Sequence, residues 1–413
     1  MEFPSALIAE IKLDQFFMEN KMQTSVSIFP KLRQYFTSWK PPRLLKRYLT
    51  LPTIIVLAFG AALIGCGGNR PDEPESPPPS LALSVFVSGR DVYVAGRKYD
   101  PSQNKYVMTL WENGAPQYLT TQQPPSLGAS VFVSGGDVHV VGNQTNGNPN
   151  ISPAYWKNCF PQQLNSIAGM AYSVFVSGED VYVAGFFIGG QVIGGQATVT
   201  RAILLKNGVP QSMDFSGGGE GRSVYVANGD VYVAGDRSEQ GKTIATLWKN
   251  GVVQNLGENL DAGISRSSAT SVFVSDEDVY VAGYADGDRR YPVLWINGTP
   301  RYLQSQTSCD EFLSVFASGG DYYIVGSVLR SDEYLATLWK NNEPGQSLAP
   351  YSKSSSSYAH SVFVSDGDVY VAGVENFRRL WDKPEALPPA LGASVPTASV
   401  ARLWKNGVAQ ELK

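Results

Sequence analysis

The chain contains seven copies of one stretch, and the clearest copy is Ser271-Val272-Phe273-Val274-Ser275-Asp276-Glu277-Asp278-Val279-Tyr280-Val281-Ala282-Gly283. The copies are spaced by 43 to 50 residues and begin at Ser84, Ser130, Ser173, Ser223, Ser271, Ser314 and Ser361. A fixed period of this length is typical of repeat architectures. It takes precedence over the two or three separate domains that a chain of 413 residues would otherwise suggest.

Each copy predicts four short antiparallel strands. In the fifth copy, 271–275 and 279–283 are rich in β-branched and aromatic residues, as strands are, and the acidic residues between them form a tight turn. A third strand is expected at 293–296, and Asn297-Gly298 is a strong hairpin signal because both residues accept positive φ. The short run 301–303 completes a four-stranded meander.

The first two strands of a copy are apolar on both faces, so both faces need to be covered. Val272 and Val281 lie on one face of the fifth copy, and Phe273 and Tyr280 lie on the other. Four-stranded sheets stacked around an axis form a β-propeller. The fold class is therefore all-β: a seven-bladed β-propeller with a four-stranded antiparallel meander in each blade. A linear β array is disfavoured because its end copies would be atypical caps, and here they are not.

The array resembles the kelch and WD-type propellers in repeat length and strand number. The strand 279–283, Val-Tyr-Val-Ala-Gly, is similar to the Ile-Tyr-Val-Ile-Gly-Gly strand of kelch repeats. The second glycine is missing in every copy, and so is the Trp-Asp pair of WD repeats. The resemblance implies an architecture for residues 84–413 and implies no function.

Several residues that look chemical recur in every copy, and the fold explains them best. Each repeated aspartate ends a tight turn, where its side chain is expected to accept a backbone N–H. The repeated tryptophan holds a fixed strand position, which favours packing between blades; Leu205 replaces it in the third copy, and His139 replaces a repeated tyrosine. The aspartates are Asp91, Asp137, Asp180, Asp230, Asp278, Asp321 and Asp368, and the tryptophans are Trp111, Trp156, Trp248, Trp295, Trp339 and Trp404.

The N-terminal segment has the order of a secretory signal. Basic residues precede an apolar run from Thr53 to Ile64, which is shorter than the roughly 20 residues of a membrane-spanning helix. The run ends in Leu63-Ile64-Gly65-Cys66, which resembles the lipobox of bacterial lipoproteins. The resemblance implies cleavage before Cys66 and acyl chains such as palmitate at this cysteine, which together anchor the protein to a membrane. The alternative is an uncleaved membrane anchor with an incidental cysteine.

The segments around Cys66 predict three parts of the chain. Residues 1–65 form a signal region that is removed on maturation, and translation is expected to begin later than Met1. Residues 66–80 carry the lipid and a Pro-rich, acidic, disordered tether. Residues 81–413 form the propeller. In Gram-negative lipoproteins, an Asp directly after the lipidated cysteine favours retention in the inner membrane. Gly67 holds this position here, so the resemblance implies the outer membrane of the cell envelope.

Function is expected at one end of the propeller. In a meander, the second-to-third and fourth-to-first connections share one end, and all variation in length falls there, so this end is the expected binding face. The residues just before each first strand should ring the central channel at this face: Leu83, Ala129, Tyr172, Arg222, Thr270, Leu313 and His360. The candidate binding residues are Tyr172, Arg222, His360, Trp381, Arg289 and Arg290.

The favoured function is a membrane-tethered, non-catalytic binding module with a glycan, a peptide or an envelope protein as its partner. The alternatives are a polysaccharide-active hydrolase or lyase, which needs convergent carboxylates on the variable face, and a structural scaffold of an envelope assembly. Residues 66–413 carry 25 Lys or Arg against 33 Asp or Glu, and an acidic body disfavours nucleic acid. No spacing of Cys, His or acidic residues predicts a metal or a cofactor.

Overall fold

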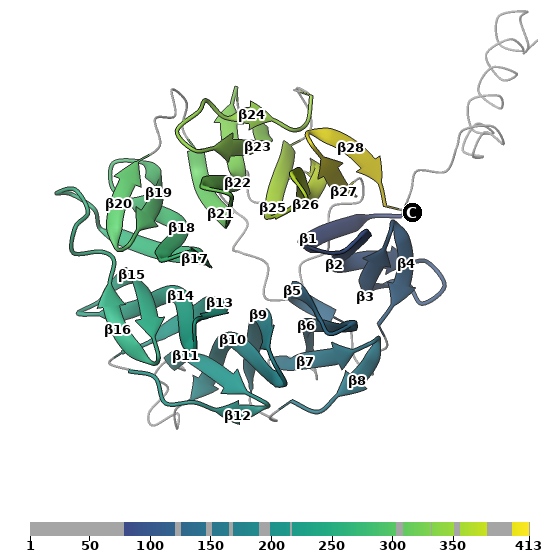
Figure 1. Cartoon of the computed structure of the whole chain (residues 1–413), viewed down its shortest axis with the longest axis horizontal. Coiled ribbons are helices and arrows are strands. Elements are labelled where there is room, and N and C mark those ends of the chain that lie inside the picture. The colour runs from purple at the N-terminus through teal and green to yellow at the C-terminus, as the bar shows by residue number, and fades with distance from the viewer. Residues whose placement is uncertain are drawn as a thin grey trace, which may run out of the picture. The chain divides into compact units, whose positions relative to one another are not determined.

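The computed structural model confirms the all-β, seven-bladed propeller (Figure 1). It describes residues 78–119, 125–145, 151–164, 168–189, 199–214, 217–302, 309–331, 333–350, 356–377 and 399–412. These residues belong to one compact unit, Ser76–Lys413. Cys66 and Trp381 lie outside the described residues. Within the described ranges, no helix has the length and apolar character to cross a bilayer.

Each blade is built from four consecutive strands, and each strand pairs antiparallel with the next one along the chain. The first four blades consist of β1 (Ser80–Ser88), β2 (Asp91–Asp100), β3 (Lys105–Glu112) and β4 (Ala115–Tyr118); β5 (Pro125–Ser134), β6 (Asp137–Thr145), β7 (Ile151–Lys157) and β8 (Phe160–Gln162); β9 (Gly169–Ser177), β10 (Asp180–Gly189), β11 (Val199–Lys206) and β12 (Val209–Pro210); and β13 (Gly219–Ala227), β14 (Asp230–Glu239), β15 (Lys242–Lys249) and β16 (Val252–Asn255). The last three consist of β17 (Arg266–Ser275), β18 (Asp278–Asp286), β19 (Arg290–Ile296) and β20 (Thr299–Tyr302); β21 (Cys309–Ser318), β22 (Asp321–Arg330), β23 (Glu333–Lys340) and β24 (Gln346–Ser347); and β25 (Ser356–Ser365), β26 (Asp368–Phe377), β27 (Val400–Lys405) and β28 (Val408–Glu411).

The ring closes without a strand being exchanged between its first and last blades. Instead, the first serine of every repeat accepts a hydrogen bond at its Oγ from a backbone N–H of the next blade, at 3.1 to 3.2 Å. The series includes Ser361 of blade 7, which accepts from Val85 of blade 1. Seven equivalent bonds therefore connect the blades in a complete circle.

Ser80 adds a second set of bonds at the junction between blades 7 and 1. Its backbone N–H donates to the carbonyl of Ser399 at 3.0 Å, and its Oγ accepts from the N–H of Ala401 at 2.9 Å. Ser80 is 6% exposed and is the first residue of β1. The first residue of β1 therefore holds blade 1 to blade 7.

A closed ring of aromatic side chains, here called the aromatic collar, surrounds the axis. Neighbouring ring centroids lie 4.2 to 4.7 Å apart, and Phe363 contacts Phe86 at 4.6 Å across the junction between blades 7 and 1. All seven side chains are half-buried. The collar consists of Phe86, Phe132, Phe175, Tyr225, Phe273, Phe316 and Phe363.

The repeated tryptophans pack between blades, as the sequence predicts. Each blade interface has its own hydrophobic cluster, and each cluster contains one of the six tryptophans or Leu205. Their exposure is between 0% and 4%. Trp111, for example, joins Val85 of its own blade to Ala372 and Leu403 of blade 7. A blade therefore obtains much of its core from its neighbours.

The repeated aspartates are structural, but the expected donor was wrong. Each carboxylate accepts a hydrogen bond at 2.7 to 2.9 Å from the side-chain amide of the asparagine in the third-to-fourth turn of its own blade, as Asp230 does from Asn250. The backbone N–H is bound by the asparagine, whose Oδ1 accepts from the residue after the aspartate. Lysine completes this arrangement in five blades at 2.6 to 2.7 Å, and Glu112 and Ile296 replace it in the other two.

Candidate functional site

The two ends of the propeller differ in the lengths of their connections. At one end, called the tight-turn end, every first-to-second turn has two residues, and the third-to-fourth turns also have two, except for five in blade 6. At the other end, called the variable end, the second-to-third connections range from 2 to 22 residues and the fourth-to-first connections from 6 to 10. Sequence reasoning placed all variation at the second end, and the only departure is the longer turn of blade 6.

The residues expected just before each first strand instead lie within it. In six blades they occupy an irregularity of the first strand, where the pairing register shifts so that they have no partner on the second strand. A bulge of this kind turns a side chain away from the regular alternation of a strand. In blade 2, Ala129 is paired with Gly142. The bulge residues are Leu83, Tyr172, Arg222, Thr270, Leu313 and His360, and all are half-buried.

The repeated glycine of the second strand makes room for this bulge. A Cβ on Gly283 would lie 2.1 Å from the carbonyl oxygen of Ser268, and a Cβ on Gly235 would lie 1.9 Å from that of Glu220. Any side chain would force the first strand away. The glycine therefore sets the position of the bulge and of the residues around it.

Two bulge residues bind the backbone of the next blade. Thr270 donates from Oγ1 to the carbonyl of Phe312 at 2.6 Å, and the Nδ1–H of His360 donates to the carbonyl of Ala82 at 2.8 Å. The two acceptors are equivalent, since each directly precedes the bulge of its blade. Burial lowers the pKa of His360, so its Nε2 has a lone pair at neutral pH. His360 stacks on Tyr358, with ring centroids 6.4 Å apart.

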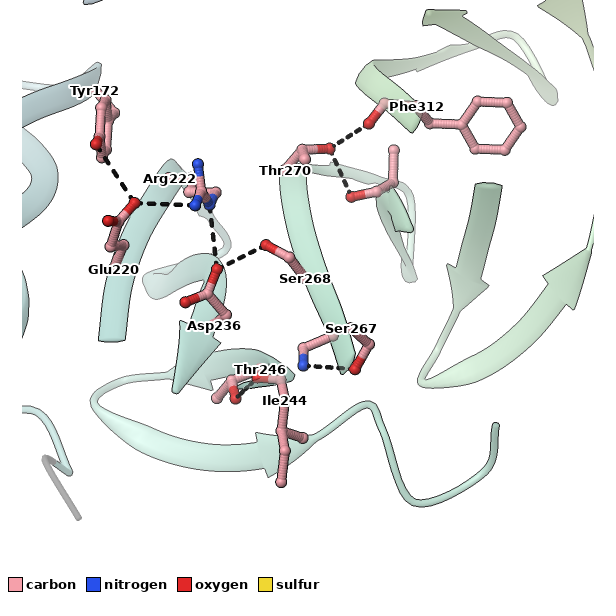
Figure 2. A network of polar contacts seen from close by, with 12 residues as sticks. Tyr172, Glu220, Arg222, Asp236, Ile244, Thr246, Ser267, Ser268, Thr270 and Phe312 are labelled. Carbon is pink, nitrogen blue, oxygen red and sulfur yellow. Dashed lines mark hydrogen bonds and ion pairs between the residues drawn. The ribbon is translucent and has the colours of Figure 1, made fainter. Parts of the chain in front are cut away.

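A charged cluster from three blades lies around the bulge residue Arg222 (Figure 2). The guanidinium binds Glu220 Oε2 through Nη2 at 2.9 Å and Asp236 Oδ2 through Nε at 3.3 Å. Ser268 Oγ donates to the same Asp236 oxygen at 2.7 Å, and the hydroxyl of Tyr172 points toward Glu220 Oε2 at 3.4 Å. We call these five residues the Arg222 cluster.

Strand register explains why these side chains meet. Glu220 on β13 is paired directly with Asp236 on β14, and Arg222 follows two residues after Glu220, at the bulge. Tyr172 is the bulge residue of β9 in the preceding blade, and its ring lies 5.9 Å from the Arg222 guanidinium. Ser268 lies on β17 of the following blade and is fully buried. The Arg222 cluster therefore spans blades 3, 4 and 5.

Burial and charge act against each other in the Arg222 cluster. Burial raises the pKa of Glu220, and Asp236 raises it further, whereas Arg222 and Arg266 oppose the shift. Burial would lower the pKa of Arg222, but the two carboxylates outweigh it and the pKa is raised. Burial, followed by Glu220, raises the pKa of Tyr172. Perturbed groups of this kind gather at functional sites and also in structural ion-pair networks.

The other predicted arginines lie in blade 5 and bind aromatic rings. Arg290 donates from Nε to Asp286 at 2.7 Å, and its guanidinium lies 4.0 Å from the ring centroid of Tyr284. Arg289 is exposed and lies 4.9 Å from the ring of Tyr291. Arg290 lies at the variable end, as the Arg222 cluster does. His360 lies in blade 7, on another part of the ring.

The candidate binding residues expected from the sequence included Tyr172 and Arg222 but neither Glu220 nor Ser268. Both missed residues lie two positions before a bulge, and the sequence does not show that this position faces the cluster. A comparison of the copies at that position finds a glutamate in two blades, since Glu311 is the counterpart of Glu220 in blade 6, whereas Leu81 and Met170 are the counterparts in blades 1 and 3. Within the described residues, no group of three or more His, Cys, Asp and Glu side chains is arranged to hold a metal ion.

Comparisons with known proteins support the fold. No family model matches the chain, and no curated protein matches it in sequence. Among solved structures, a puromycin-hydrolysing peptidase of Mycobacterium tuberculosis is similar, with a TM-score of 0.52 and 11% identity over 83% of this chain; the chain spans 57% of the length of the peptidase. The β-propeller domain of the Trilobed protease from Pyrococcus furiosus matches with a TM-score of 0.47, 10% identity, 81% of this chain and 98% of that domain. The phage phi92 endosialidase matches with a TM-score of 0.44, 11% identity, 80% of this chain and 68% of that protein. At 11% identity, the likeness to the peptidase shows a shared fold and no activity.

Proposed function

We propose that this protein is a non-catalytic binding module of the bacterial cell envelope that engages its partner through the variable end of the propeller. The observation that carries the proposal is the Arg222 cluster. It lies at the variable end, its members Tyr172, Glu220 and Arg222 are half-buried, and its combination of residues occurs in no other copy of the repeat. A binding site on one part of the ring needs residues that differ between blades. A residue that is identical in every blade is explained by the structure of the blade itself.

The contrast with the tight-turn end supports this proposal. There, the repeated aspartates, asparagines and lysines bind one another within each blade. Their side chains are explained by the turns they stabilise. At the variable end, connections of different length surround side chains that no turn requires, and such connections commonly carry binding residues on a rigid scaffold.

The second part of the proposal is a lipid anchor at Cys66, and it rests on the lipobox resemblance of residues 63–66. Cys66→Ser would remove the acylated sulfur. The variant should appear in the aqueous fraction of lysed cells and carry no palmitate label, while the wild-type protein stays with outer membranes. A variant that remains in the membrane fraction would favour an uncleaved anchor instead.

Blocking one end of the propeller at a time tests the binding face. A bulky maleimide polymer is attached to Gln240→Cys at the variable end or to Arg90→Cys at the tight-turn end, in a full-length protein without Cys159 and Cys309. Both positions are exposed. The polymer at Gln240→Cys should prevent capture of envelope components, and the polymer at Arg90→Cys should not. Equal capture by both would contradict the proposed face, and no capture by the unblocked protein would favour a structural scaffold.

A polysaccharide hydrolase or lyase is the second candidate, and one observation favours it. Glu220 and Asp236 converge on one guanidinium, and the raised pKa of Glu220 is what a general acid needs. Glu220→Gln keeps the hydrogen-bonding shape but cannot release a proton. If the protein cleaves polysaccharide, this variant should lose cleavage and keep binding, as measured by release of reducing ends. The absence of cleavage by the wild-type protein would leave the binding module.

A further inference from the structure

The side chains around the axis form two layers at the variable half of the propeller. The upper layer contains the bulge residues, and the lower layer is the aromatic collar. The collar lies three residues further along each first strand, for example at Phe86 relative to Leu83, which corresponds to about 10 Å. The aromatic collar therefore lies deeper than the bulge residues, as measured from the variable end.

The upper layer has a polar and a less polar side. Tyr172, Arg222 and Thr270 are consecutive bulge residues of blades 3 to 5. Blades 6, 7 and 1 contribute Leu313, the uncharged His360 and Leu83. A ligand with one polar side and one apolar side matches this arrangement.

The charges of the polar side balance. Arg222 lies between Glu220 and Asp236. Arg266 lies two residues before Ser268 on β17, its guanidinium is 5.9 Å from the ring of Tyr284, and it acts to lower the pKa of Glu220. Two cations therefore face two carboxylates. A site built for a strongly anionic or cationic ligand would have an excess of the opposite charge.

The Arg222 cluster has donors and acceptors to spare. Among the described residues, nothing binds Nη1 of Arg222, Oε1 of Glu220 or Oδ1 of Asp236. The side chains of Arg222 and Glu220 are 30% and 24% exposed. A hydroxyl group both donates and accepts, so neighbouring hydroxyls bind a guanidinium and a carboxylate at the same time. Spare groups of both kinds side by side favour a polyhydroxylated ligand.

We propose that the Arg222 cluster and the aromatic collar recognise the end of a neutral carbohydrate chain. Ring hydroxyls bind Arg222 and its carboxylates, and the apolar C–H face of a sugar ring packs against the aromatic rings. This inference rests on the proposed binding function and names the ligand class of the same face. It commits to a neutral sugar because the charges of the cluster balance.

Full-length protein in detergent is titrated with maltose, cellulose, chitin and galactan oligomers, with galacturonate oligomers and a neutral peptide as comparisons. At least one neutral oligomer should bind. Arg222→Gln should weaken that binding about ten- to hundredfold, because it removes charged hydrogen bonds. Tyr172→Phe, which removes only a hydroxyl group, should weaken it less and keep the fold.

Arg402→Gln is the matched control. Arg402 binds Glu375 at 2.7 Å, and its side chain is 25% exposed, close to the 30% of Arg222. It lies on β27, the third strand of blade 7. The control should lose comparable thermal stability and keep the sugar affinity. Equal loss of binding in both variants would overturn the carbohydrate site.

The outcomes separate the two proposals. Binding only to galacturonate or to the peptide, or unchanged binding by Arg222→Gln, would overturn the neutral carbohydrate. If the blocked Gln240→Cys variant loses envelope capture and no oligosaccharide competes with that capture, the binding module stands and the carbohydrate inference falls. If neither capture nor sugar binding occurs, both fall.

Discussion

Asp230 and Asp236 lie six residues apart on β14, at opposite ends of the propeller, and their partners differ in kind. Asp230 binds Lys249 and Asn250 of its own blade, at the tight-turn end. Asp236 binds Arg222 of its own blade and Ser268 of the next one, at the variable end. The first arrangement recurs around the ring, whereas the second occurs in blade 4. Residues of one type therefore serve the scaffold at one end and form the candidate site at the other.

The largest effect is expected from the core that both ends share. Trp295→Ala should reduce the free energy of unfolding by about 3–5 kcal/mol, because Trp295 is fully buried between blades 4 and 5 and leaves a large cavity. Urea unfolding measures the loss. Val252→Ala, at a side chain that is 68% exposed, is the control and should change stability by about 0.5 kcal/mol or less. Similar losses in both variants would contradict the packing role.

A smaller loss of stability is expected from the tight-turn end. Asn250→Ala should cost about 1–2 kcal/mol, because it removes the bonds to Asp230 and to the N–H of Val231 and places alanine at φ +52°. Glycine adopts this φ without strain. Asn250→Gly should therefore lose only the stability that comes from the hydrogen bonds of the asparagine side chain. Partner binding at the variable end should be unaffected in both, and a loss of binding would break the proposed separation of the two ends.

At the tight-turn end, the free energy of unfolding should decrease as the pH falls. Hydrogen bonding to Lys249 holds the pKa of Asp230 below its ordinary value of 3.8. The native state therefore binds fewer protons than the unfolded state, and the stability from this carboxylate is present above pH 3.8 and lost as the pH falls through the native pKa. In the Asp230→Asn variant, the free energy of unfolding should depend less on pH between pH 5 and about pH 2 than in the wild-type protein. Urea unfolding measures this dependence. An unchanged slope would show that the ion pair contributes nothing.

The smallest effect, with the opposite sign, is expected from Glu220. Its pKa is raised above the ordinary 4.5, so its contribution is fully present below pH 4.5 and is lost as the pH rises through the native pKa. Glu220→Gln cannot ionise and should therefore gain stability relative to the wild-type protein as the pH rises from 4 to about 7. A relative loss over this range would mean that the ion pair with Arg222 outweighs burial.

Local patterns predicted much of the scaffold. The strands, the Asn-Gly turns and the tryptophans between blades follow from the period, from β-branched residues and from turn chemistry, all of which act within one repeat. The bonding of Asp230 was predicted with the wrong donor, since its partner Asn250 lies 20 residues away on the other hairpin turn. Tyr172 and Arg222 were predicted to lie just before the first strand, whereas they lie at a bulge within it. The residue pattern does not reveal a bulge.

The sequence by itself determined seven blades, their buried tryptophans and the end at which the connections vary, because each of these depends on neighbours within about 45 residues. Only the tertiary structure decided that Ser361 reaches Val85 and that Glu220, Arg222 and Asp236 meet Tyr172 and Ser268. The first contact needs a closed ring, and the cluster needs the register shifts that place Tyr172 and Arg222 in two adjacent blades. Contacts between blades depend on how whole sheets stack, and no single repeat contains that information.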